Sequence, residues 1–360
     1  MQAINGKITY SLCTMRRLQM KKGLLVLLVV FLVFAPLAAQ GSKEDGAAAK
    51  ELVVYASVDE ANAVKILDAF TKDSGIKTSF VQLSSGPALT RIQAESGRPQ
   101  ADVWLGAPSD NHVTAKNDGL TVPYKGESFE GLGAEFKDAE GYWRGFYMNP
   151  LCFGVNTAAL AKAGASVPRS WADLLKPEYK GLIQVPTPQA SGTATTMVYS
   201  LIEIMGENEA FAYMTKLNSN IQTYTSSGTG PSKGVNVGDC AIGIQFSPAF
   251  FQMKANGQPV EIVFPSEGFG FEFPAASILK GAKNYEAAKI FMDWLVSKKG
   301  QDVLKSTGTY FYPVIDSAEI DPVMPAFSTL DVVGIDLAYY SARKGELVER
   351  WVSEVLSAKK

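Results

Sequence analysis

Strand-like and helix-like stretches alternate along the chain from residue 51 onward. The helical spacing is clearest in 59–75, where apolar side chains recur at Ala63, Ile66, Leu67 and Phe70. The pattern predicts, in order, strand 51–57, helix 59–75, strand 76–83, helix 84–96 and strand 101–107. This rhythm predicts parallel strands joined by right-handed crossovers, in which ligands bind where strands end and helices begin.

The middle of the chain repeats the rhythm without repeating the residues. It predicts strands 181–188, 222–225, 240–246 and 260–265, a helix over 191–206, a helix after 222–225, and one strand followed by one long amphipathic helix within 270–304. Two α/β lobes, with the chain passing between them more than once, fit this order better than two domains in series. The predicted fold class is therefore α/β, with two lobes in which helices flank a sheet.

The first 41 residues have a different composition. A basic stretch at 15–22 precedes the apolar run 23–39, and small residues flank a cleavage pattern at 39–41. This order is typical of a secretory signal peptide, although the apolar run is also nearly long enough to anchor the chain in a membrane. Residues 1–14 read as upstream sequence. Residues 42–50 read as a polar linker, and no cysteine follows the apolar run to carry a lipid.

Charge and cysteine content narrow the function classes. Without the five basic residues of 1–41, the chain keeps 29 basic and 36 acidic residues, a net charge of −7. An acidic exported protein is a poor candidate for nucleic-acid binding, which depends on neutralising phosphates. Cys152 and Cys240 lie in apolar runs, where a disulfide and two buried thiols are both open readings. With His112 as the only histidine and no CxxC, we expect no metal site and no cofactor.

Three turns rich in serine, threonine and glycine each stand between a predicted strand and a predicted helix. Amides at a helix N-terminus carry partial positive charge, glycine lets a ligand approach the backbone, and hydroxyls add donors. Such turns bind phosphate or carboxylate, although any one of them is equally explained as an ordinary helix cap. The candidate ligand-binding residues are Ser84, Ser85 and Gly86, then Ser191, Gly192 and Thr193, then Ser226, Ser227, Gly228 and Thr229.

Further residues are candidates for the same cleft. Ser57 ends the first strand, and Ser247 follows the strand 240–246. Asp59, Lys233 and Tyr224 are secondary candidates. A carboxylate beside an anion site suits a ligand that also carries an amine or several hydroxyls, but Asp59 also reads as a helix cap. Lys233 reads equally as a solvated side chain.

Two common phosphate-binding motifs are missing. The run 228–234 lacks the Gly-Lys-Ser/Thr order of a phosphate-binding P-loop, and G-x-G-x-x-G does not occur. A single histidine argues against a serine hydrolase, which needs a histidine as its general base. An exported phosphoester hydrolase would need a general base or a metal, for which the sequence offers only Asp59 and Glu60 nearby.

Several longer runs resemble the two-lobed, type-2 periplasmic solute-binding proteins of ABC importers. They span nearly all of 51–356 and include "SWADLLKPEYKGLI", "GFYMNPLCFGVNT" and "ILKGAKNYEAAKIFMDWLVSKKGQ". The resemblance implies two lobes, each a mixed sheet flanked by helices, with a ligand held in the cleft between them. It further implies hinge closure, no catalysis, and delivery of the solute to a membrane permease with its ATPase. It also implies a periplasmic or extracellular monomer.

The resemblance also implies lobe boundaries, with the chain crossing between the lobes near 147–155 and 265–275. We expect one lobe from 51–147 plus about 273–320, a second from 148–272, and a C-terminal helical segment over 321–360.

The group that this chain resembles includes binders of ferric iron, phosphonates and sugar phosphates. Its ferric binders resemble one another in a tyrosine pair at the end of the strand that here reads "AIGIQF", where this chain has Phe246 and Ser247. They often carry a histidine in the first loop, which here reads "SVDEA". Because Fe(III) prefers phenolate and carboxylate oxygens, the sequence favours an organic phosphate or phosphonate, with ferric iron as the alternative.

Overall fold

The structure, a computed structural model, describes residues 51–359. The expected signal peptide and linker lie outside the described residues. Among those described, no helix has the length and apolar character needed to cross a membrane.

The first of two sheets is built mainly from the N-terminal strands. Its order is β2-β1-β3-β12-β4, with β5 paired to β12, and β1 runs parallel to both β2 and β3 whereas β12 runs antiparallel to β3. The strands are β1 (Glu51–Ser57), β2 (Lys77–Gln82), β3 (Val103–Pro108), β4 (Thr121–Val122), β5 (Arg144–Gly145) and β12 (Pro274–Leu279). The sheet is therefore mixed, because β12 returns from much later in the chain.

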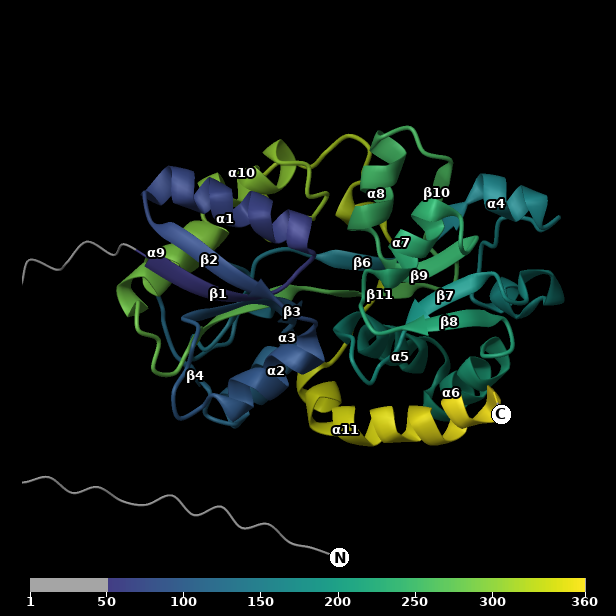
Figure 1. The fold of residues 1–360 in the computed structure, drawn as a ribbon, viewed down its shortest axis with the longest axis horizontal. Coiled ribbons are helices and arrows are strands. Elements are labelled where there is room, and N and C mark those ends of the chain that lie inside the picture. The colour runs from purple at the N-terminus through teal and green to yellow at the C-terminus, as the bar shows by residue number, and fades with distance from the viewer. Residues whose placement is uncertain (1–50, 360) are drawn as a thin grey trace, which may run out of the picture. The chain divides into compact units, whose positions relative to one another are not determined.

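Helices cover both faces of this sheet (Figure 1). They are α1 (Glu60–Ser74), α2 (Ser85–Ala94), α3 (Ser109–Asn117), α9 (Tyr285–Val296) and α10 (Lys298–Ser306). On one face Phe70 of α1 packs edge-on against Phe291 of α9. On the other face Tyr55 and Trp104 pack with α2 and α3. Burial of these apolar side chains stabilises the first lobe.

The second sheet is built from the middle of the chain and one late strand. Its order is β13-β11-β6-β9-β7-β8, with β10 paired to β6. The strands are β6 (Asn149–Asn156), β7 (Ile183–Pro186), β8 (Ile221–Thr225), β9 (Ile242–Phe246), β10 (Val260–Val263), β11 (Phe269–Glu272) and β13 (Val332–Val333). Parallel and antiparallel pairs occur together here as well.

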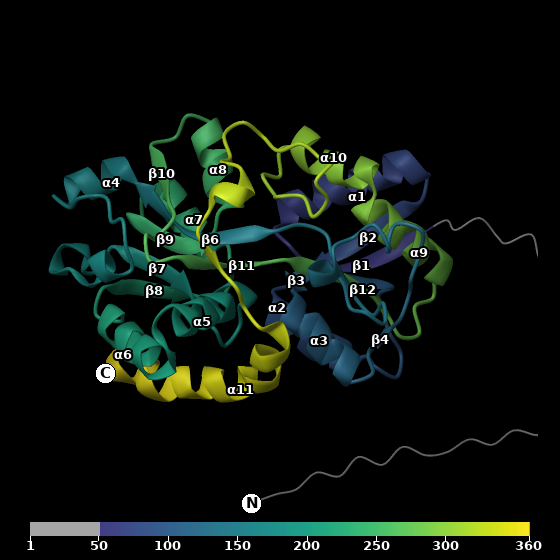
Figure 2. The ribbon, with the colours of Figure 1, turned by 180° about the vertical axis from the view of Figure 1, so that it is seen from behind.

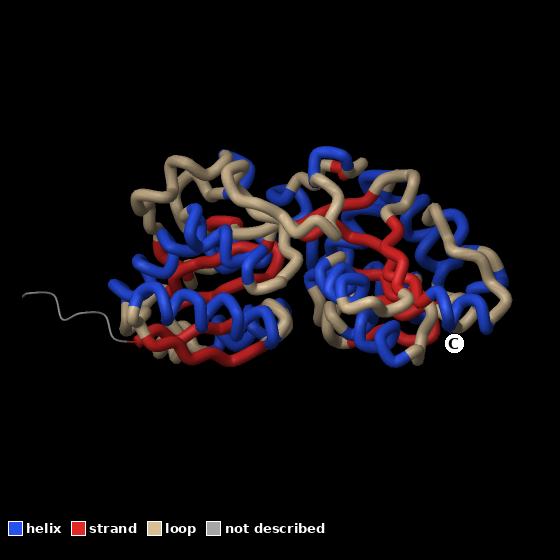
Figure 3. Tube along the Cα trace, turned by 90° about the horizontal axis from the view of Figure 1, so that it is seen from above, coloured by secondary structure: helices blue, strands red, loops and turns tan. Residues whose placement is uncertain are grey.

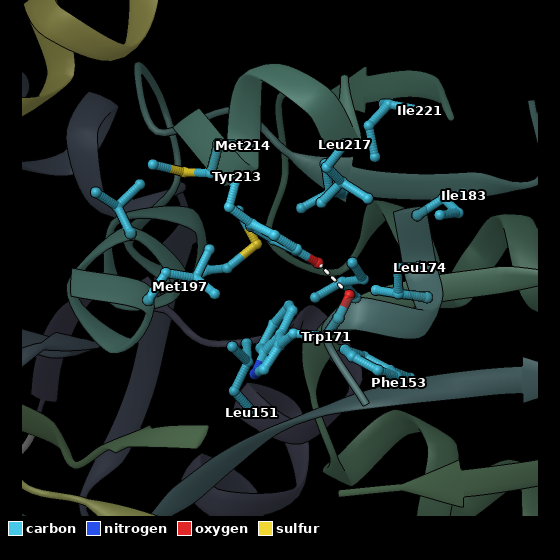
Figure 4. Packing of buried hydrophobic residues seen from close by; sticks show 14 of the residues in the cluster. Leu151, Phe153, Trp171, Leu174, Ile183, Met197, Tyr213, Met214, Leu217 and Ile221 are labelled. Atoms are coloured by element: carbon cyan, nitrogen blue, oxygen red, sulfur yellow. Dashed lines mark hydrogen bonds between the residues drawn. The ribbon is translucent and has the colours of Figure 1, made fainter. Parts of the chain in front are cut away.

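Helices also flank this second sheet, and Figure 4 shows the core on one of its faces. There the hydroxyl of Tyr213 donates to the carbonyl oxygen of Trp171 over 2.7 Å. The α-helices are α4 (Thr157–Lys162), α5 (Gly192–Met205), α6 (Glu207–Leu217), α7 (Gly230–Val237), α8 (Pro248–Ala255) and α11 (Leu337–Glu354). Short 3₁₀ helices span Ala134–Phe136, Ala172–Leu175, Pro177–Tyr179, Phe327–Thr329 and Leu356–Lys359.

The two sheets form the centres of two lobes, which confirms the predicted fold class (Figures 1 and 3). The chain leaves the first sheet after β5 and enters the second with β6. It returns through Phe273, between β11 and β12. After α10 it passes to the second lobe again, and Figure 2 shows this last segment running down to α11.

The predicted long helix within 270–304 is wrong. This range holds two strands, β11 and β12, followed by two helices that meet at Ser297. The Ser297 hydroxyl caps α10 by accepting from the amide of Gly300 at 3.1 Å and donates to the carbonyl oxygen of Trp294 at 2.7 Å. The apolar spacing stops at Val296 and resumes at Val303, and the Ser297 cap lies in this interval. Helices α3, α4, α6 and α8 were also absent from the predicted set.

Both cysteines of the second lobe, Cys152 and Cys240, are buried and free, so the thiol reading holds. Burial raises the pKa of Cys240 to about 12, which keeps this thiol protonated and unreactive.

His112 has a structural role in the first lobe. Its ring is fully buried, stacks on Trp104 at 4.3 Å between centroids, and bonds to the Ser277 hydroxyl and the Gly106 carbonyl. Burial lowers the pKa of His112 to about 4.

We therefore expect the free energy of unfolding to fall by about 3 kcal/mol as the pH drops from 6.5 toward 4. In this range the histidine takes up a proton only in the unfolded chain. Urea unfolding at pH 7 and 4.5 checks this, and His112→Gln should reduce the difference.

Candidate functional site

A cavity of about 430 Å³ lies between the two lobes. The C-terminal ends of β1, β2 and β3 and the start of α2 line it from the first lobe, and the starts of α5, α7 and α8 line it from the second. Residues of the segments that join the lobes, among them Tyr147 and Glu272, complete the wall.

Most of the predicted site residues line this cavity. They come from all three serine- and glycine-rich turns and from the end of the first strand. The residues found in the wall are Ser57, Asp59, Ser84, Ser85, Ser191, Gly192, Thr193, Ser227, Gly228, Thr229 and Lys233. Segments more than a hundred residues apart in the sequence therefore meet at one place.

Four predicted residues lie outside the wall. Gly86 faces the backbone of Ala190 across the lobes, and Ser226 is exposed. Ser247 is fully buried at the start of α8, and its hydroxyl has no partner among the described residues. These three residues follow the strands from which the site was predicted, but none of them lines the cavity.

Tyr224, the fourth, is on the far side of its strand from the cavity. Its hydroxyl donates to Asn218, and its ring packs edge-on against Trp351 of α11. The side chain is thus partly buried and packs against the hydrophobic core of the second lobe.

The two lobes are in contact at the α5 turn. The amide of Gly192 donates to the Ser85 hydroxyl over 2.8 Å, so this first amide of α5 is already used. The next two amides, of Thr193 and Ala194, have no hydrogen-bond partner within residues 51–359. The α5 N-terminus therefore keeps two free donors with the helix dipole behind them, and Thr193, which carries one of the two, lines the cavity.

The α7 turn contributes hydroxyls more than helix amides. Pro231 has no N–H, and the amide of Ser232 donates to the buried side chain of Gln245 over 2.7 Å. Gly228 packs against Thr193: a Cβ at this position would lie 2.4 Å from the Thr193 hydroxyl. Glycine is needed here because the two turns of the second lobe approach each other closely, which brings their hydroxyls together.

Two residues of the first lobe have identifiable partners. The Ser57 hydroxyl accepts from the indole N–H of Trp104 over 2.9 Å, which leaves its own proton to donate to a ligand. Asp59 caps α1 by accepting from the amide of Ala61 over 3.1 Å, so it is a helix cap that also borders the cavity.

Sequence reasoning missed the acceptors at the segments that join the lobes. Glu272 and Asn149 line the cavity and are 7% and 5% exposed, and Glu272 Oε2 and Asn149 Oδ1 have no partner within the described chain. Burial, and then the charge of Asp110, hold the pKa of Glu272 well above its usual range. The available signal was a single acid inside the apolar run "GFGFEFPAAS".

Aromatic rings form another part of the wall. Tyr147 stacks on Phe311 with 3.8 Å between ring centroids, and burial raises the pKa of Tyr147 well above its usual range. Its phenolate form is therefore disfavoured. Within residues 51–359, no three or more His, Cys, Asp or Glu side chains are grouped so that they could hold a metal ion.

Comparisons with known proteins identify the family to which this chain is similar. Residues 100–339 match the family model described as bacterial extracellular solute-binding protein. An uncharacterized protein of Haemophilus influenzae is 37% identical over 91% of this chain and 96% of its own length. An Fe(3+)-binding periplasmic protein of Serratia marcescens is 26% identical over 83% of this chain and 89% of its own.

A solved structure is similar in both sequence and fold. The periplasmic binding protein AfuA from Actinobacillus pleuropneumoniae, with exogenous fructose-6-phosphate bound, superposes with a TM-score of 0.82. It is 34% identical, and the match covers 85% of this chain and 99% of AfuA.

Proposed function

This chain belongs to the bacterial extracellular solute-binding protein family, and we propose that it binds a small organic phosphate or phosphonate between its lobes. It would then deliver this solute to an ABC permease at the membrane. Its relatives include periplasmic binding proteins, and we place this chain in the periplasm or outside the cell, as a monomer without catalytic activity.

The observation that carries the proposal is the meeting of three donor-rich turns around one cavity. Hydroxyls of Ser57, Ser191 and Ser227, together with the unpartnered amides of α5, offer neutral donors from both lobes. Neutral donors at a helix start bind a phosphate group without a cationic side chain. Lys233, which also borders the cavity, adds positive charge on the same side as the α7 turn.

Glu272 and Asn149 indicate which chemical groups the ligand carries besides its phosphate or phosphonate. Their unpartnered oxygens are buried acceptors, and burying an acceptor without a donor is costly. A ligand with hydroxyls or an amine would supply the missing donors. A sugar phosphate or an aminoalkyl phosphonate has both parts, and the cavity volume suits a ligand of that size.

A ferric ion fits this wall less well. The position of the tyrosine pair is taken by Phe246 and the buried Ser247. Tyr147, which does border the cavity, is held in its protonated form. The hard oxygen ligands that Fe(III) prefers are therefore poorly represented.

We propose that the lobe boundaries follow the sequence prediction, with 51–147 and about 273–320 in the first lobe and 148–272 in the second. Sheet membership supports this division. For the C-terminal segment 321–360, support for a place on the second lobe comes from the pairing of β13 with β11.

Isothermal titration calorimetry with the folded protein tests the ligand class. Glucose 6-phosphate, fructose 6-phosphate and 2-aminoethylphosphonate are expected to bind more tightly than inorganic phosphate, and ferric citrate is expected not to bind. If ferric citrate gave heat and none of the phosphates or phosphonates did, the proposal of an organic anion as the ligand would be wrong. Heat from none of these, with a native circular dichroism spectrum, would argue against the proposal.

Ser191→Ala and Ser227→Ala are each expected to weaken binding of glucose 6-phosphate by roughly tenfold or more, because each removes one hydrogen bond to a charged group. The same titration measures both variants. Ser226→Ala, an exposed serine outside the cavity, is the matched control and should leave affinity unchanged. If both cavity variants bind like the native protein, these serines only cap helices.

Glu272→Gln is expected to weaken glucose 6-phosphate binding about tenfold and to leave inorganic phosphate binding unchanged. The substitution replaces one carboxyl oxygen by an amide nitrogen, which cannot accept a hydrogen bond, and only a ligand long enough to reach β11 meets it. Titration with the two compounds separates the two ends of the site. An equal loss for both would place the phosphate group at Glu272 instead.

A further inference from the structure

Helix α11, the last long helix, is fixed to the second lobe. Arg343 and Arg350 form ion pairs with Glu207 of α6, at 2.7 and 2.9 Å. Tyr340 stacks on Tyr199 of α5 with 4.4 Å between ring centroids. These contacts tie α11 to α5 and α6, so it is expected to move with the second lobe.

The same helix also contacts α3 of the first lobe. Lys344 Nζ lies 3.0 Å from Asp110 Oδ2 and 2.6 Å from Asn111 Oδ1. The Ser341 hydroxyl donates to the carbonyl oxygen of Asp110 over 3.2 Å. An ion pair therefore links the two lobes outside the cavity, because neither Asp110 nor Lys344 lines it.

Burial makes this pair sensitive to the separation of the lobes. The Asp110 side chain is only 1% exposed, and the Lys344 side chain 24%. Removing Lys344 would leave the Asp110 charge buried without compensation in this arrangement, which is strongly destabilising. Moving α11 away from α3 would break the ion pair together with the hydrogen bonds of Lys344 to Asn111 and of Ser341 to Asp110. Hydrogen bonds to a charged group are stronger than neutral ones, so these contacts favour the arrangement in which Ser85 and Gly192 also touch.

The pair also lies next to the binding site. Asp110 follows Pro108, which lines the cavity, by two residues in the chain. The charge of Asp110 raises the pKa of Glu272, in the cavity wall, and the charge of Lys344 lowers it. The ion pair of Asp110 with Lys344 is therefore near the cavity in sequence, through Pro108, and interacts electrostatically with Glu272 in the cavity wall.

We propose that Asp110 and Lys344 are positioning residues, a clamp between α3 and α11 that holds the two halves of the binding site together. The clamp raises the closed fraction of the protein before a solute arrives. Its effect on affinity rests on the proposed solute binding between the lobes, whereas its effect on lobe separation does not.

Lys344→Met tests the clamp, with interlobe distances measured without ligand by double electron–electron resonance. Spin labels are placed at Lys72→Cys on α1 and Lys254→Cys on α8, both exposed, while Cys152 and Cys240 are buried. The sample starts at residue 42, so that Cys13 takes no label. We expect the distance distribution to shift to longer values, and glucose 6-phosphate affinity to fall about tenfold. Lys176→Met is the matched control, because Lys176 pairs with Asp173 within the second lobe.

A second variant keeps the test valid if the single variant does not fold. Asp110→Asn combined with Lys344→Met leaves no buried charge unpaired, so the protein should fold, and the lobe distance should still shift. A native distance distribution in whichever of these variants folds would overturn the clamp. A shifted distribution together with no heat from any phosphate would support the clamp and count against the proposed solute.

Discussion

Gly192→Ala is expected to weaken solute binding by roughly ten- to a hundredfold while each lobe stays folded. A Cβ at this position would lie 2.4 Å from the ring of Pro108 and 3.0 Å from the Ser85 hydroxyl, both in the first lobe. Alanine suits the first turn of α5 locally, so the conflict arises only across the lobes. Overpacking of this kind costs about 1–3 kcal/mol, and each 1.4 kcal/mol is a tenfold change in affinity.

Titration with glucose 6-phosphate measures this loss, and thermal unfolding checks the fold. Gly97→Ala serves as the control, because a Cβ there meets no atom within 4 Å. Native affinity in the Gly192 variant would mean that the solute is held with the lobes further apart than they are here.

Gly300→Ala is expected to lower the free energy of unfolding by roughly 3 kcal/mol, at the upper end for overpacking. A Cβ at this position would lie 2.0 Å from the backbone carbonyl oxygen of Trp294. Backbone cannot rotate aside as a side chain can, so the junction of α9 and α10 must shift. The Ser297 cap, which depends on the Gly300 amide, would shift with it.

Urea unfolding measures the effect. Gly345→Ala in α11 is the matched helical control, since nothing lies within 4 Å of its Cβ position, and it should be neutral or slightly stabilising. A native midpoint in the Gly300 variant would mean that the two helices are not locked at this junction.

Much of the first lobe could be predicted because its signals are local. Helical spacing from Ala63 to Phe70 and the apolar run of β1 lie within single elements, and both agree with the structure. The junction at Ser297 was not predicted, although apolar positions stop at Val296 and resume only at Val303. The Ser297 hydroxyl, which accepts from the Gly300 amide, marks the start of the second helix.

The candidate site divides in the same way. Turn chemistry pointed to the segments around Ser85, Ser191 and Ser227, because each turn carries its own strand, glycine and helix start. The sequence could not show which helix amides remain free to bind a ligand. The amide of Ser232 donates to Gln245, and the amide of Gly192 donates to Ser85. These partners come from other strands or from the other lobe.

The sequence by itself determined that the chain is an α/β protein of two lobes and which turns can offer donors to an anion, because strand, helix and turn signals depend on neighbouring residues. Only the tertiary structure decided that these turns share one cavity, that Glu272 and Asn149 face it with unpartnered oxygens, and that α11 contacts both lobes. Such features depend on residues brought together from distant segments, and no local pattern records which segments those are.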